Sequence, residues 1–584
     1  MYDASDFCVY ACEMRCRWVP DRCIDPNGCH FSQNGGIITS LHTGRRQGDL
    51  PEHAKHQYNQ RIQKHVRNST GVIAAGHPQT LRVAADILKS GGNAFDAVVA
   101  AHLAACVTEP VLSSPGGGGF LMARTPDARQ TLYDFFVHTP RKRRSTDELE
   151  FYPISADFGE TVQEFHIGMG SAGTPGTVRG LFAIQRDLCR MSMKQLAGPA
   201  IELARNGVPL NHFQAYILDI VSPIFKAVPD SLAIYGHPKR KGELLVDGDL
   251  LLQPDLADFL EVMALEGEDL FYRGEIAAAV DRMSQSTGGH LTLEDFQSYD
   301  VIRRKPLKTT YRGMAELAFN PAPSSGGTLI AFALKLMEET DPSEHPFGSA
   351  GHLLRLAKVQ QLTDQARIDY LIKNNLPVPG EDMLDAEYLA GYRRYISDYA
   401  RFTRGTTHIS VMDADGNTAS LTTSNGEGCS HIIPDTGIML NNMLGEEDLN
   451  PGGFHRWPED TRITSMMTPG TLTMNDNTVV AFGSGGSNRI RTAILQVISN
   501  LIDHEMSLED ATRSPRIHCE KEHLSVEHGF DQPALAPVLT AFPDHKLWSG
   551  SNLFFGGVHS VMCGPDGFQG AGDERRGGVS EVVR

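Results

Sequence analysis

The first regularly patterned part of the chain is a short apolar run followed by two helical patterns. Residues 71–75 (Gly-Val-Ile-Ala-Ala) are continuously apolar and predict a buried strand. Apolar residues then recur at helical spacing over 81–88, and Gly91-Gly92 ends that helix. The stretch 94–105 consists mostly of small apolar residues. It therefore predicts a helix that is buried on all sides.

A β-hairpin is predicted in the second half of the chain. Residues 408–412 alternate, with Ile409 and Val411 on one face, and residues 418–423 alternate in the same way. The turn 413–417 between them contains an Asp-Gly pair, which favours a tight hairpin bend. This segment is therefore expected to lie within a sheet.

A strand, a glycine-rich segment and a helix follow one another near the end of the chain. Residues 479–482 are apolar and predict a strand, and Gly483-Ser484-Gly485-Gly486-Ser487 comes directly after it. Residues 494–502 then show apolar positions on one helical face. Strands joined by hairpins and covered by helices indicate an α+β architecture.

Three stretches differ in character from this patterned core. Residues 1–70 are polar and irregular and are interpreted as an N-terminal extension. The section 171–370 is mostly helical. Residues 371–405 are polar and broken by Pro377 and Pro379, which predicts an exposed connector.

The charge balance is acidic, with 53 Lys and Arg against 71 Asp and Glu, for a net charge of −18. A nucleic-acid-binding protein usually presents a basic face, so this balance argues against one. The basic run 140–144 is interpreted as a solvated loop. No stretch approaches the roughly 18 apolar residues of a membrane span. No signal peptide is visible, which predicts a cytoplasmic protein as the sequence is written, or a periplasmic or secreted one if its start is not native.

The cysteines do not form a recognisable metal-binding pattern. Five of the ten are close to the start of the chain, and zinc sites usually combine two closely spaced pairs. These five are Cys8, Cys12, Cys16, Cys23 and Cys29. The others are scattered and are interpreted as reduced core thiols. We therefore predict no metal and no cofactor.

Candidate chemistry begins at Gly405-Thr406-Thr407. A threonine hydroxyl is a weak nucleophile unless a base takes its proton, and an N-terminal threonine can use its own α-amine. That amine has a pKa of about 7.7–8.0, so much of it is neutral near physiological pH. An internal Thr406 would reach this state by cleavage of the bond before it, and Gly405 tolerates the backbone strain of that step. Taken alone, the same tripeptide is better explained as a turn glycine that opens a strand.

A series of collinear motifs over 71–584 resembles the γ-glutamyltransferase family. The resemblance includes the start of the family's small subunit, at 406–411, and its Leu-Asn-Asn segment, at 440–442. The other matching segments are 71–78, 88–97, 109–110 with the glycine run 116–119, 173–178, 271–274, 291–296 and 323–327.

This resemblance implies a four-layer αββα sandwich of the N-terminal-nucleophile hydrolases. It implies a large subunit, 71–405, and a small catalytic subunit, 406–584, cut from one precursor. Thr406 would be the processing site and nucleophile, supported by Ser424. Gly486 and Ser487 match the pair whose backbone N–H groups form the oxyanion hole, although a tight turn would also explain that loop.

The substrate-binding positions depart from the family pattern. Phe136 stands where the family has the arginine that clamps the donor's α-carboxylate, and phenyl cannot replace a guanidinium there. Glu446 matches the acidic residue that binds the α-amine, and it is longer by one methylene. Ser465 matches the first carboxylate-binding serine, but the second is Met466. Asn425 is a further candidate for substrate contact, and Gly426 beside it stands where the family has an asparagine.

Four other arginines were considered as replacements for the missing carboxylate-binding arginine: Arg141, Arg143, Arg144 and Arg462.

Three functions remain open at this point. The first is a γ-glutamyltransferase-like enzyme that passes an acyl group from a glutathione-like amide to water or an amine. The second is a cephalosporin-acylase-like enzyme with a less polar acyl group, and the third is an unprocessed binding protein. The expected partners are a small-molecule amide and the two subunits, with a possible homo-oligomer and neither nucleic acid nor membrane.

Overall fold

The computed structural model describes residues 69–157, 162–374, 379–392, 406–450 and 452–584, together with four short strands nearer the start. The chain divides into two units, Met1–Gln57 and Tyr58–Arg584. In the first unit, four strands pair in sequence order: β1 (Arg17–Val19), β2 (Arg22–Ile24), β3 (His30–Phe31) and β4 (Ile37–Ile38). Apart from these strands, the prediction of an irregular extension falls on residues outside the described ranges.

The second unit contains a seven-stranded antiparallel sheet with the predicted hairpin near its middle. Its order is β12 (Ile302–Arg304), β7 (Gln130–Phe135), β6 (Gly118–Arg124), β16 (Thr418–Ser424), β15 (Thr407–Asp413), β5 (Gly71–Ala75) and β26 (Val579–Val583). In the hairpin, Ile409 pairs with Leu421 and Met412 with Thr418. The predicted hairpin and the predicted strand 71–75 are therefore confirmed.

A six-stranded antiparallel sheet lies against this one. Its order is β13 (Leu307–Tyr311), β14 (Ala315–Phe319), β19 (Gly470–Met474), β20 (Val479–Gly485), β24 (Gly557–Gly564) and β25 (Gly567–Ala571). Strands β15 and β16 of the first sheet contact β20 of the second. The Ser410 hydroxyl donates to the carbonyl of His559 (3.3 Å), and that of Ser420 to the carbonyl of Phe482 (2.9 Å). The two sheets are thus joined partly by hydrogen bonds from small side chains of one sheet to backbone carbonyls of the other.

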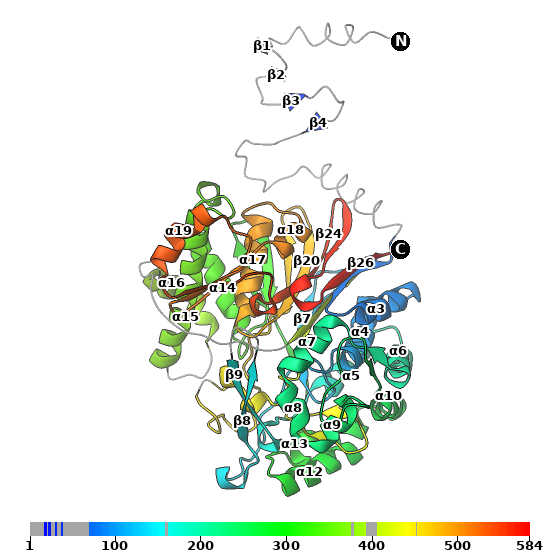
Figure 1. The fold of residues 1–584 in the computed structure, drawn as a ribbon. Helices are drawn as coiled ribbons and strands as arrows, with labels where there is room; N and C mark the ends of the chain where they lie inside the picture. The colour runs from blue at the N-terminus through cyan, green and yellow to red at the C-terminus, as the bar shows by residue number, and fades with distance from the viewer. Residues whose placement is uncertain are drawn as a thin grey trace, which may run out of the picture. The chain divides into compact units, whose positions relative to one another are not determined.

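Helices cover the outer side of each sheet (Figure 1). The seven-stranded sheet packs against α3 (Pro78–Lys89), α4 (Ala94–Thr108) and α5 (Thr177–Leu188), with α6 (Met193–Asn206) and α10 (Pro254–Glu266) beyond them. The six-stranded sheet packs against α14 (Gly326–Met337) and α17 (Arg489–Ile502), next to α15 (Ala350–Asn374) and α18 (Leu508–Arg513).

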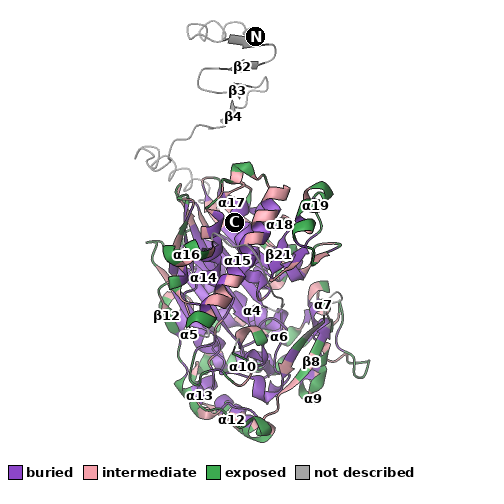
Figure 2. Cartoon of the chain, turned by 90° about the vertical axis from the view of Figure 1, so that its left-hand side faces the viewer, coloured by how far each residue is buried: buried purple, intermediate pink, exposed green. Residues whose placement is uncertain are grey.

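The remaining elements of the second unit lie around these layers. They are β8 (Tyr152–Asp157), β9 (Val162–Ile167), β10 (Val208–Pro209), β11 (Leu250–Leu251), β17 (Ile432–Ile433), β18 (Ile438–Met439), β21 (Ile517–Glu520), β22 (His523–Val526), β23 (His545–Leu547), α7 (His212–Ile220), α8 (Ser222–Ala227), α9 (Pro229–Tyr235), α11 (Asp269–Tyr272), α12 (Glu275–Thr287), α13 (Leu293–Ser298), α16 (Ala386–Tyr392), α19 (Gln532–Ala541) and eight short 3₁₀ turns. Figure 2 shows α4 and α14 in the buried centre, whereas α19 is largely exposed.

Helix α4 shows how the sequence fixes a buried element. All of its residues are buried, as its uniformly small and apolar composition predicts. Asn93 caps its start in a capping box with Asp96, which satisfies backbone N–H groups that would otherwise be buried without partners. The Ala94 N–H also donates to Asp413 at the hairpin turn (2.9 Å). The helix is thereby tied to the strand that begins at Thr407.

The predicted exposed connector, 371–405, is described only in part; most of the residues described there are exposed or half-buried, and the connector stays a prediction. Residues 371–374 belong to α15, and Met383 and the α16 residue Leu389 are buried against the core of the six-stranded sheet. Two apolar residues in an otherwise polar stretch are enough to anchor this short segment. The stretches 375–378 and 393–405, including Gly405, lie outside the described residues.

The two sheets come close together where Gly483 of β20 faces the ring of His408 in β15. A Cβ on Gly483 would overlap that ring. The ring cannot easily move, because its nitrogens are hydrogen-bonded to Thr422 (2.7 Å) and Ser410 (2.8 Å). Burial lowers the pKa of His408 well below its ordinary value, with His559 acting in the same direction, so the ring is neutral. The interface therefore depends on glycine at 483.

We expect Gly483→Ala to lower the free energy of unfolding by roughly 1–3 kcal/mol, because one added methyl overpacks a rigid polar interface. Chemical denaturation monitored by circular dichroism measures this change. Gly198→Ala is the matched control, since a Cβ at this α6 position has no atom within 4 Å. It should be neutral or stabilising, because alanine favours a helix interior by about 0.5–1 kcal/mol. Equal effects at the two positions would contradict the proposed constraint.

Candidate active site

Most of the predicted site residues line one cavity at the edge of the two sheets. It lies between the start of β15, the end of β16 and the loop that joins β20 to α17. Its lining consists of Phe136, Thr406, Ser424, Met443, Glu446, Leu449, Ser465, Met466, Met467, Ser487 and Ile490. Segments far apart in the sequence thus meet around Thr406.

Thr406 immediately precedes β15 and is buried. Its carbonyl lies so close to Gly485 that a Cβ at that position would overlap it. The same carbonyl accepts a hydrogen bond from Arg576 Nη1 (3.4 Å). The backbone of Thr406 is therefore held by the end of β20 on one side and by a guanidinium on the other.

The next residue, Thr407, contacts a buried carboxyl group. Its hydroxyl donates to Glu109 Oε2 (2.8 Å), and the hydroxyl of Thr80 donates to Oε1 (3.1 Å). Burial raises the pKa of Glu109 to about 7, although both hydrogen bonds act to lower it. Gly76 makes room for this cluster, because a Cβ there would approach Glu109 within 2.7 Å. The carboxyl group of Glu109, which can bind a proton, thus contacts the first residue of β15.

The glycine loop bends sharply between β20 and α17. Gly486 has φ +120° and Ser487 has φ +50°, so two consecutive residues take conformations that L side chains disfavour. The Ser487 hydroxyl donates to Asp448 Oδ2 (2.7 Å), which holds the loop. Neither the Gly486 nor the Ser487 backbone N–H donates a hydrogen bond within the described part of the chain. Because interior N–H groups are nearly always paired, these two are suited to bind a ligand atom.

The other predicted positions divide into those at the cavity and those beside it. Ser424 and Ser465 line it, and their hydroxyls accept from the N–H groups of Gly426 and Met467, each at 3.0 Å. Phe136 also lines it, with its ring 5.3 Å from that of Phe120. Gly486 and Asn425 are outside the lining, and Asn425 Nδ2 instead donates to the carbonyl of Met439 (3.4 Å). The contact of Asn425 with substrate therefore stays a prediction.

Glu446 lies in space that a side chain at 426 would otherwise occupy. Gly426 has φ +63°, and a Cβ there would overlap Glu446 Oε1 and Asn442 Oδ1. Glu446 is buried, and its backbone carbonyl accepts from Asn450 Nδ2 (2.7 Å). The glycine at 426 and the longer acid at 446 are therefore complementary.

The four candidate replacement arginines do not line the cavity. Arg462 is buried behind Phe136, where it donates to the Phe136 carbonyl and to that of Asp300 (2.6 Å) and lies 3.4 Å from Asp134. Arg141 pairs with Glu294 and Asp460, Arg143 with Glu459, and Arg144 with Glu148. No lysine or arginine belongs to the lining formed by the described residues.

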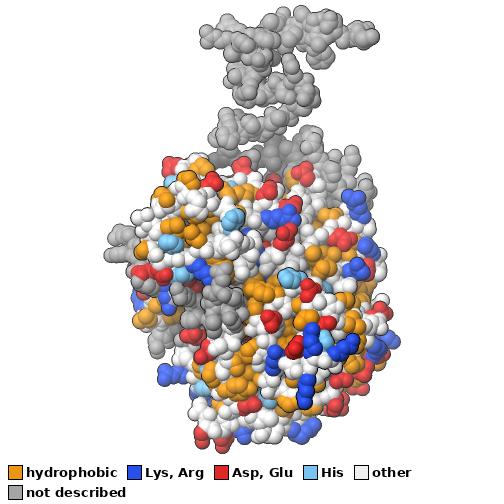
Figure 3. All heavy atoms as spheres, viewed as in Figure 1, with side chains coloured by type: hydrophobic (Ala, Val, Ile, Leu, Met, Phe, Trp, Pro, Cys, Tyr) orange, Lys and Arg blue, Asp and Glu red, His pale blue; other side chains and the backbone are white. Residues whose placement is uncertain are grey.

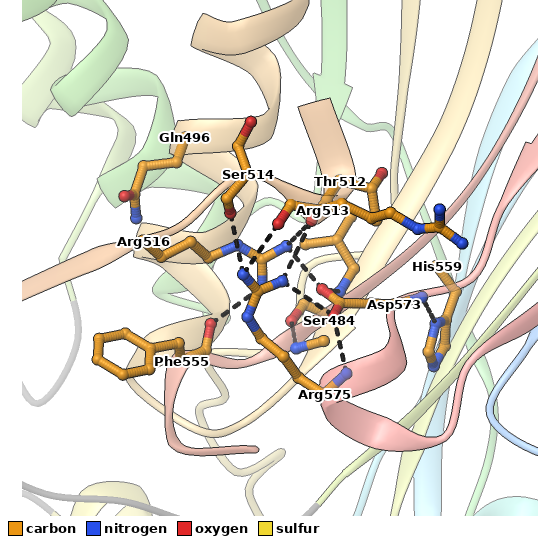
Figure 4. Close-up of polar contacts among 12 residues, drawn as sticks. Ser484, Gln496, Thr512, Arg513, Ser514, Arg516, Phe555, His559, Asp573 and Arg575 are labelled. Carbon is orange, nitrogen blue, oxygen red and sulfur yellow. Dashed lines mark hydrogen bonds and ion pairs between the residues drawn. The ribbon is translucent and has the colours of Figure 1, made fainter. Parts of the chain in front are cut away.

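A buried charge network supports the arginine that contacts Thr406 (Figure 4). Arg516 donates to Asp573 (2.6 Å), and Arg575 donates to Glu527 through two nitrogens (2.7 and 2.6 Å). Burial alone would raise the pKa of Asp573, but Arg516 and Arg575 hold it at about 2. The network fixes the turn Glu574–Arg576 and hence the Arg576 side chain.

Several residues that line the cavity or hold Thr406 were not predicted from the sequence. Met443, Leu449, Met467 and Ile490 line the cavity without any distinctive local motif. Arg576 lies in a compact charged run, 573–576, within a glycine-rich end of the chain. That run is the signal that could have indicated a buried ion network.

Other predicted absences concern metals, membranes and nucleic acid. The described residues contain no group of three or more His, Cys, Asp and Glu placed to hold a metal, and the cysteines at 8–29 are outside them. Within the same ranges no helix combines the length and apolar character needed to cross a bilayer. Cys106, Cys429 and Cys519 are buried free thiols. Acidic and basic side chains are interspersed on the described surface in Figure 3.

Comparison with known proteins agrees with this geometry. The gamma-glutamyltranspeptidase family model matches residues 81–583. The glutathione hydrolase proenzyme of Escherichia coli K12 is 31% identical over 547 residues, covering 87% of this chain and 91% of that protein. The Acylase ACY 1 proenzyme of Pseudomonas sp. SE83 is 31% identical over 524 residues, covering 86% and 92%. The crystal structure of cephalosporin acylase from Bacillus halodurans has a TM-score of 0.73 at 23% identity, covering 88% of this chain and 96% of that one, and shares the fold.

Fold and cavity together define an enzyme of the amide-hydrolysing and acyl-transferring class. Its relatives include both hydrolases and acylases that are named as proenzymes. The chain belongs to the gamma-glutamyltranspeptidase family. The resemblance drawn from its sequence motifs is confirmed.

Glu109 predicts a pH-dependent stability. Its folded-state pKa of about 7 exceeds the ordinary value of 4.5, so the folded protein binds this proton more tightly than the unfolded chain. Stability should therefore fall as pH rises from about 4.5 to about 7, by on the order of 3 kcal/mol from this group. We expect Glu109→Gln to remove this contribution, so that the variant gains stability relative to wild type over that range. Urea denaturation of both proteins at several pH values measures it, and parallel pH profiles would contradict the assignment.

Proposed function

We propose that this chain cleaves itself before Thr406 and then uses Thr406 as the nucleophile in amide hydrolysis and acyl transfer. The observation that carries the proposal is the position of Thr406. It lines a cavity beside the glycine loop and Ser424, and its backbone is held by Gly485 and Arg576. A threonine with only a structural role would not need to line a cavity beside the glycine loop and Ser424.

The proposed mechanism assigns a role to each neighbouring group. The α-amine of the new N-terminal Thr406 takes the hydroxyl proton, and the oxygen attacks the donor's amide carbonyl. The N–H groups of Gly486 and Ser487 stabilise the negative oxygen of the tetrahedral intermediate. The α-ammonium then gives its proton to the departing amine, leaving an acyl ester on Thr406. Water or a second amine attacks this ester and restores the hydroxyl, while Ser424 lines the same cavity and supports the nucleophile.

The arrangement of layers supports assignment to the αββα sandwich of the N-terminal-nucleophile hydrolases. Two sheets lie face to face, and helices pack on the outer side of each. The predicted large and small subunits, 71–405 and 406–584, both contribute strands to each sheet. The borders between them are β6–β16, β15–β5 and β5–β26 in one sheet and β14–β19 in the other. Cleavage before Thr406 would therefore leave the two pieces joined by continuous hydrogen bonding.

Family membership supports a γ-glutamyl amide, as in glutathione, as one donor class. The name of the E. coli relative states glutathione hydrolysis for that protein. A second candidate is the acylase reaction, because Phe136 and Met466 give the cavity apolar walls where an ionised donor group would need a partner. In both cases the substrate is a small molecule and the covalent chemistry at Thr406 is the same.

The first test is processing. We expect the purified protein to contain a fragment that begins Thr-Thr-His-Ile-Ser, and Thr406→Ala to remain one chain without acyl transfer, because it has no hydroxyl. Intact mass and N-terminal sequencing measure cleavage, and release of p-nitroaniline from acyl anilides measures turnover. Thr407→Ala is the neighbouring control and should still be cut. A Thr406→Ala protein that is cleaved or active would refute the assignment.

The second test is the glycine loop. Gly486→Val should slow acylation by roughly 100-fold or more, because a β-branched residue at φ +120° would displace the proposed oxyanion donors. The matched control is Gly248→Val, at φ +84° with no atom within 4 Å of its Cβ position. It introduces comparable backbone strain away from the cavity. Equal turnover in the two variants would show that the loop is structural only.

A further inference from the structure

The loop assigned to oxyanion binding is held mainly by side chains. Gly486 and Ser487 have φ +120° and +50°, and their carbonyls accept from the N–H groups of Arg489 and Ile490 at the start of α17, each at 3.0 Å. Their own N–H groups donate to no other group in the described part of the chain. No strand pairing therefore fixes the direction of these two N–H groups, and contacts of neighbouring side chains have to do so.

The side chain of Ser487 makes one such contact. Its hydroxyl donates to Asp448 Oδ2 at 2.7 Å, a distance typical of a hydroxyl bound to a carboxylate. This hydrogen bond helps to offset the cost of a φ that L side chains disfavour. The next side chain, Asn488, donates from Nδ2 to Glu520 Oε1 (2.9 Å) and fixes the beginning of α17 separately. Loss of the serine contact would therefore free the loop rather than the helix.

The carboxylate that accepts this hydrogen bond is carried by a well-held turn. Asp448 belongs to the 3₁₀ turn Glu447–Leu449, directly after the cavity residue Glu446. The side chain of Asn450 holds the turn, because its Nδ2 donates to the carbonyls of Met443 (3.1 Å) and Glu446 (2.7 Å). Asp448 can therefore act as a fixed point for the loop on the other side of the cavity.

A positive charge near Asp448 favours its ionised form. Burial lowers the pKa of Arg489 to about 10, and Glu520 and Asp448 act to raise it. The guanidinium of Arg489 is therefore charged near neutral pH, and it lies over the ring of Phe554, 4.3 Å from the centroid. An ionised carboxylate only accepts hydrogen bonds, so it fixes the direction in which the serine hydroxyl points.

We propose that Asp448 is a positioning residue that, through the hydroxyl of Ser487, holds the N–H groups of Gly486 and Ser487 towards the developing oxyanion. This inference rests on the proposed function, because it concerns the loop assigned there to the tetrahedral intermediate. Asp448 itself is outside the cavity lining. Every amide donor forms the same oxyanion, so Asp448 affects the rate and not the choice of acyl group.

Ser487→Gly separates positioning from a purely structural role. Glycine removes the hydroxyl but suits φ +50°, so the free energy of unfolding should stay close to that of wild type. The kcat should nevertheless fall about 10- to 100-fold with KM nearly unchanged, because the loop acts on the transition state. Release of p-nitroaniline from γ-glutamyl-p-nitroanilide and butanoyl-p-nitroanilide measures this, per chain shown by mass to be cut before Thr406. The loss should be equal for both donors.

Substitutions of Asp448 test the same contact from its other side. Asp448→Ala should be as slow as Ser487→Gly, and the double variant should be no slower than either, because both changes remove one interaction. Asp448→Asn should recover to within about 3-fold of wild type, since its amide oxygen still accepts from the hydroxyl. The matched control is Ser499→Ala, at the other end of α17, where the hydroxyl donates to Asp503 Oδ2, also at 2.7 Å. It should keep the wild-type kcat.

Several outcomes would overturn the inference and leave the proposed function standing. They are full activity or absence of the cut in Ser487→Gly, losses that differ between the two donors, additive losses in the double variant, Asp448→Asn as slow as Asp448→Ala, and an equal loss in Ser499→Ala. Wild-type protein that is cut before Thr406 but releases p-nitroaniline from neither donor would instead overturn the proposed function, and the inference with it.

Discussion

The close approach of the two sheets at β15 and β20 is the constraint on which the rest of the site depends. Gly483 leaves room for the His408 ring, and Gly485 leaves room for the Thr406 carbonyl. Both glycines belong to β20, whereas His408 belongs to β15 and Thr406 immediately precedes it. A side chain at either glycine would move Thr406 away from the loop at 486–487. The position of Thr406, the proposed nucleophile, and the packing of the two sheets are therefore determined by the same contacts.

The same arrangement explains why so many polar groups are buried near the cavity. Strands packed at short range through small residues cannot be separated by bulky apolar side chains, so serine and threonine hydroxyls bridge to carbonyls of the facing sheet. Farther out, the ion network around Asp573 anchors the turn that carries Arg576. Buried charges of this kind require several partners at once. These charges favour one arrangement of the turn Glu574–Arg576. Because Arg576 contacts the Thr406 carbonyl, Thr406 is held as a result.

Predictions from the sequence were correct where one local pattern determines one helix or hairpin. The all-apolar composition of α4 and the alternation around Ile409 predicted buried helix and hairpin correctly. Collinear motifs predicted that Thr406, Glu446 and Ser465 belong to one site, and they line one cavity. Within the connector at 371–405, the burial of Met383 and Leu389 was not predicted, because isolated apolar residues are hard to recognise in a polar stretch. Asn425 is outside the cavity lining, and its contact with substrate stays a prediction.

Contacts between distant segments could not be derived in this way. Nothing in the local sequence of Arg576 indicates that its guanidinium reaches Thr406. The four unpredicted apolar lining residues come from separate segments: Ile490 belongs to α17, and Met443, Leu449 and Met467 lie outside the main helices and strands. The complementary sizes of Gly426 and Glu446 could not be predicted either. In the sequence each residue is an isolated departure from the family pattern. Only the structure shows that the glycine at 426 makes room for the side chain of Glu446.

The pairing of β5 with β26 and the contact of Arg576 with Thr406 also affect how the protein folds. The two strands are far apart in the sequence, and Arg576 and Thr406 are separated by 170 positions. Pairings of this kind close long loops before any contact is gained, and proteins rich in them fold slowly. If the chain cuts itself before Thr406, as proposed, these distant segments have to fold together before the cut.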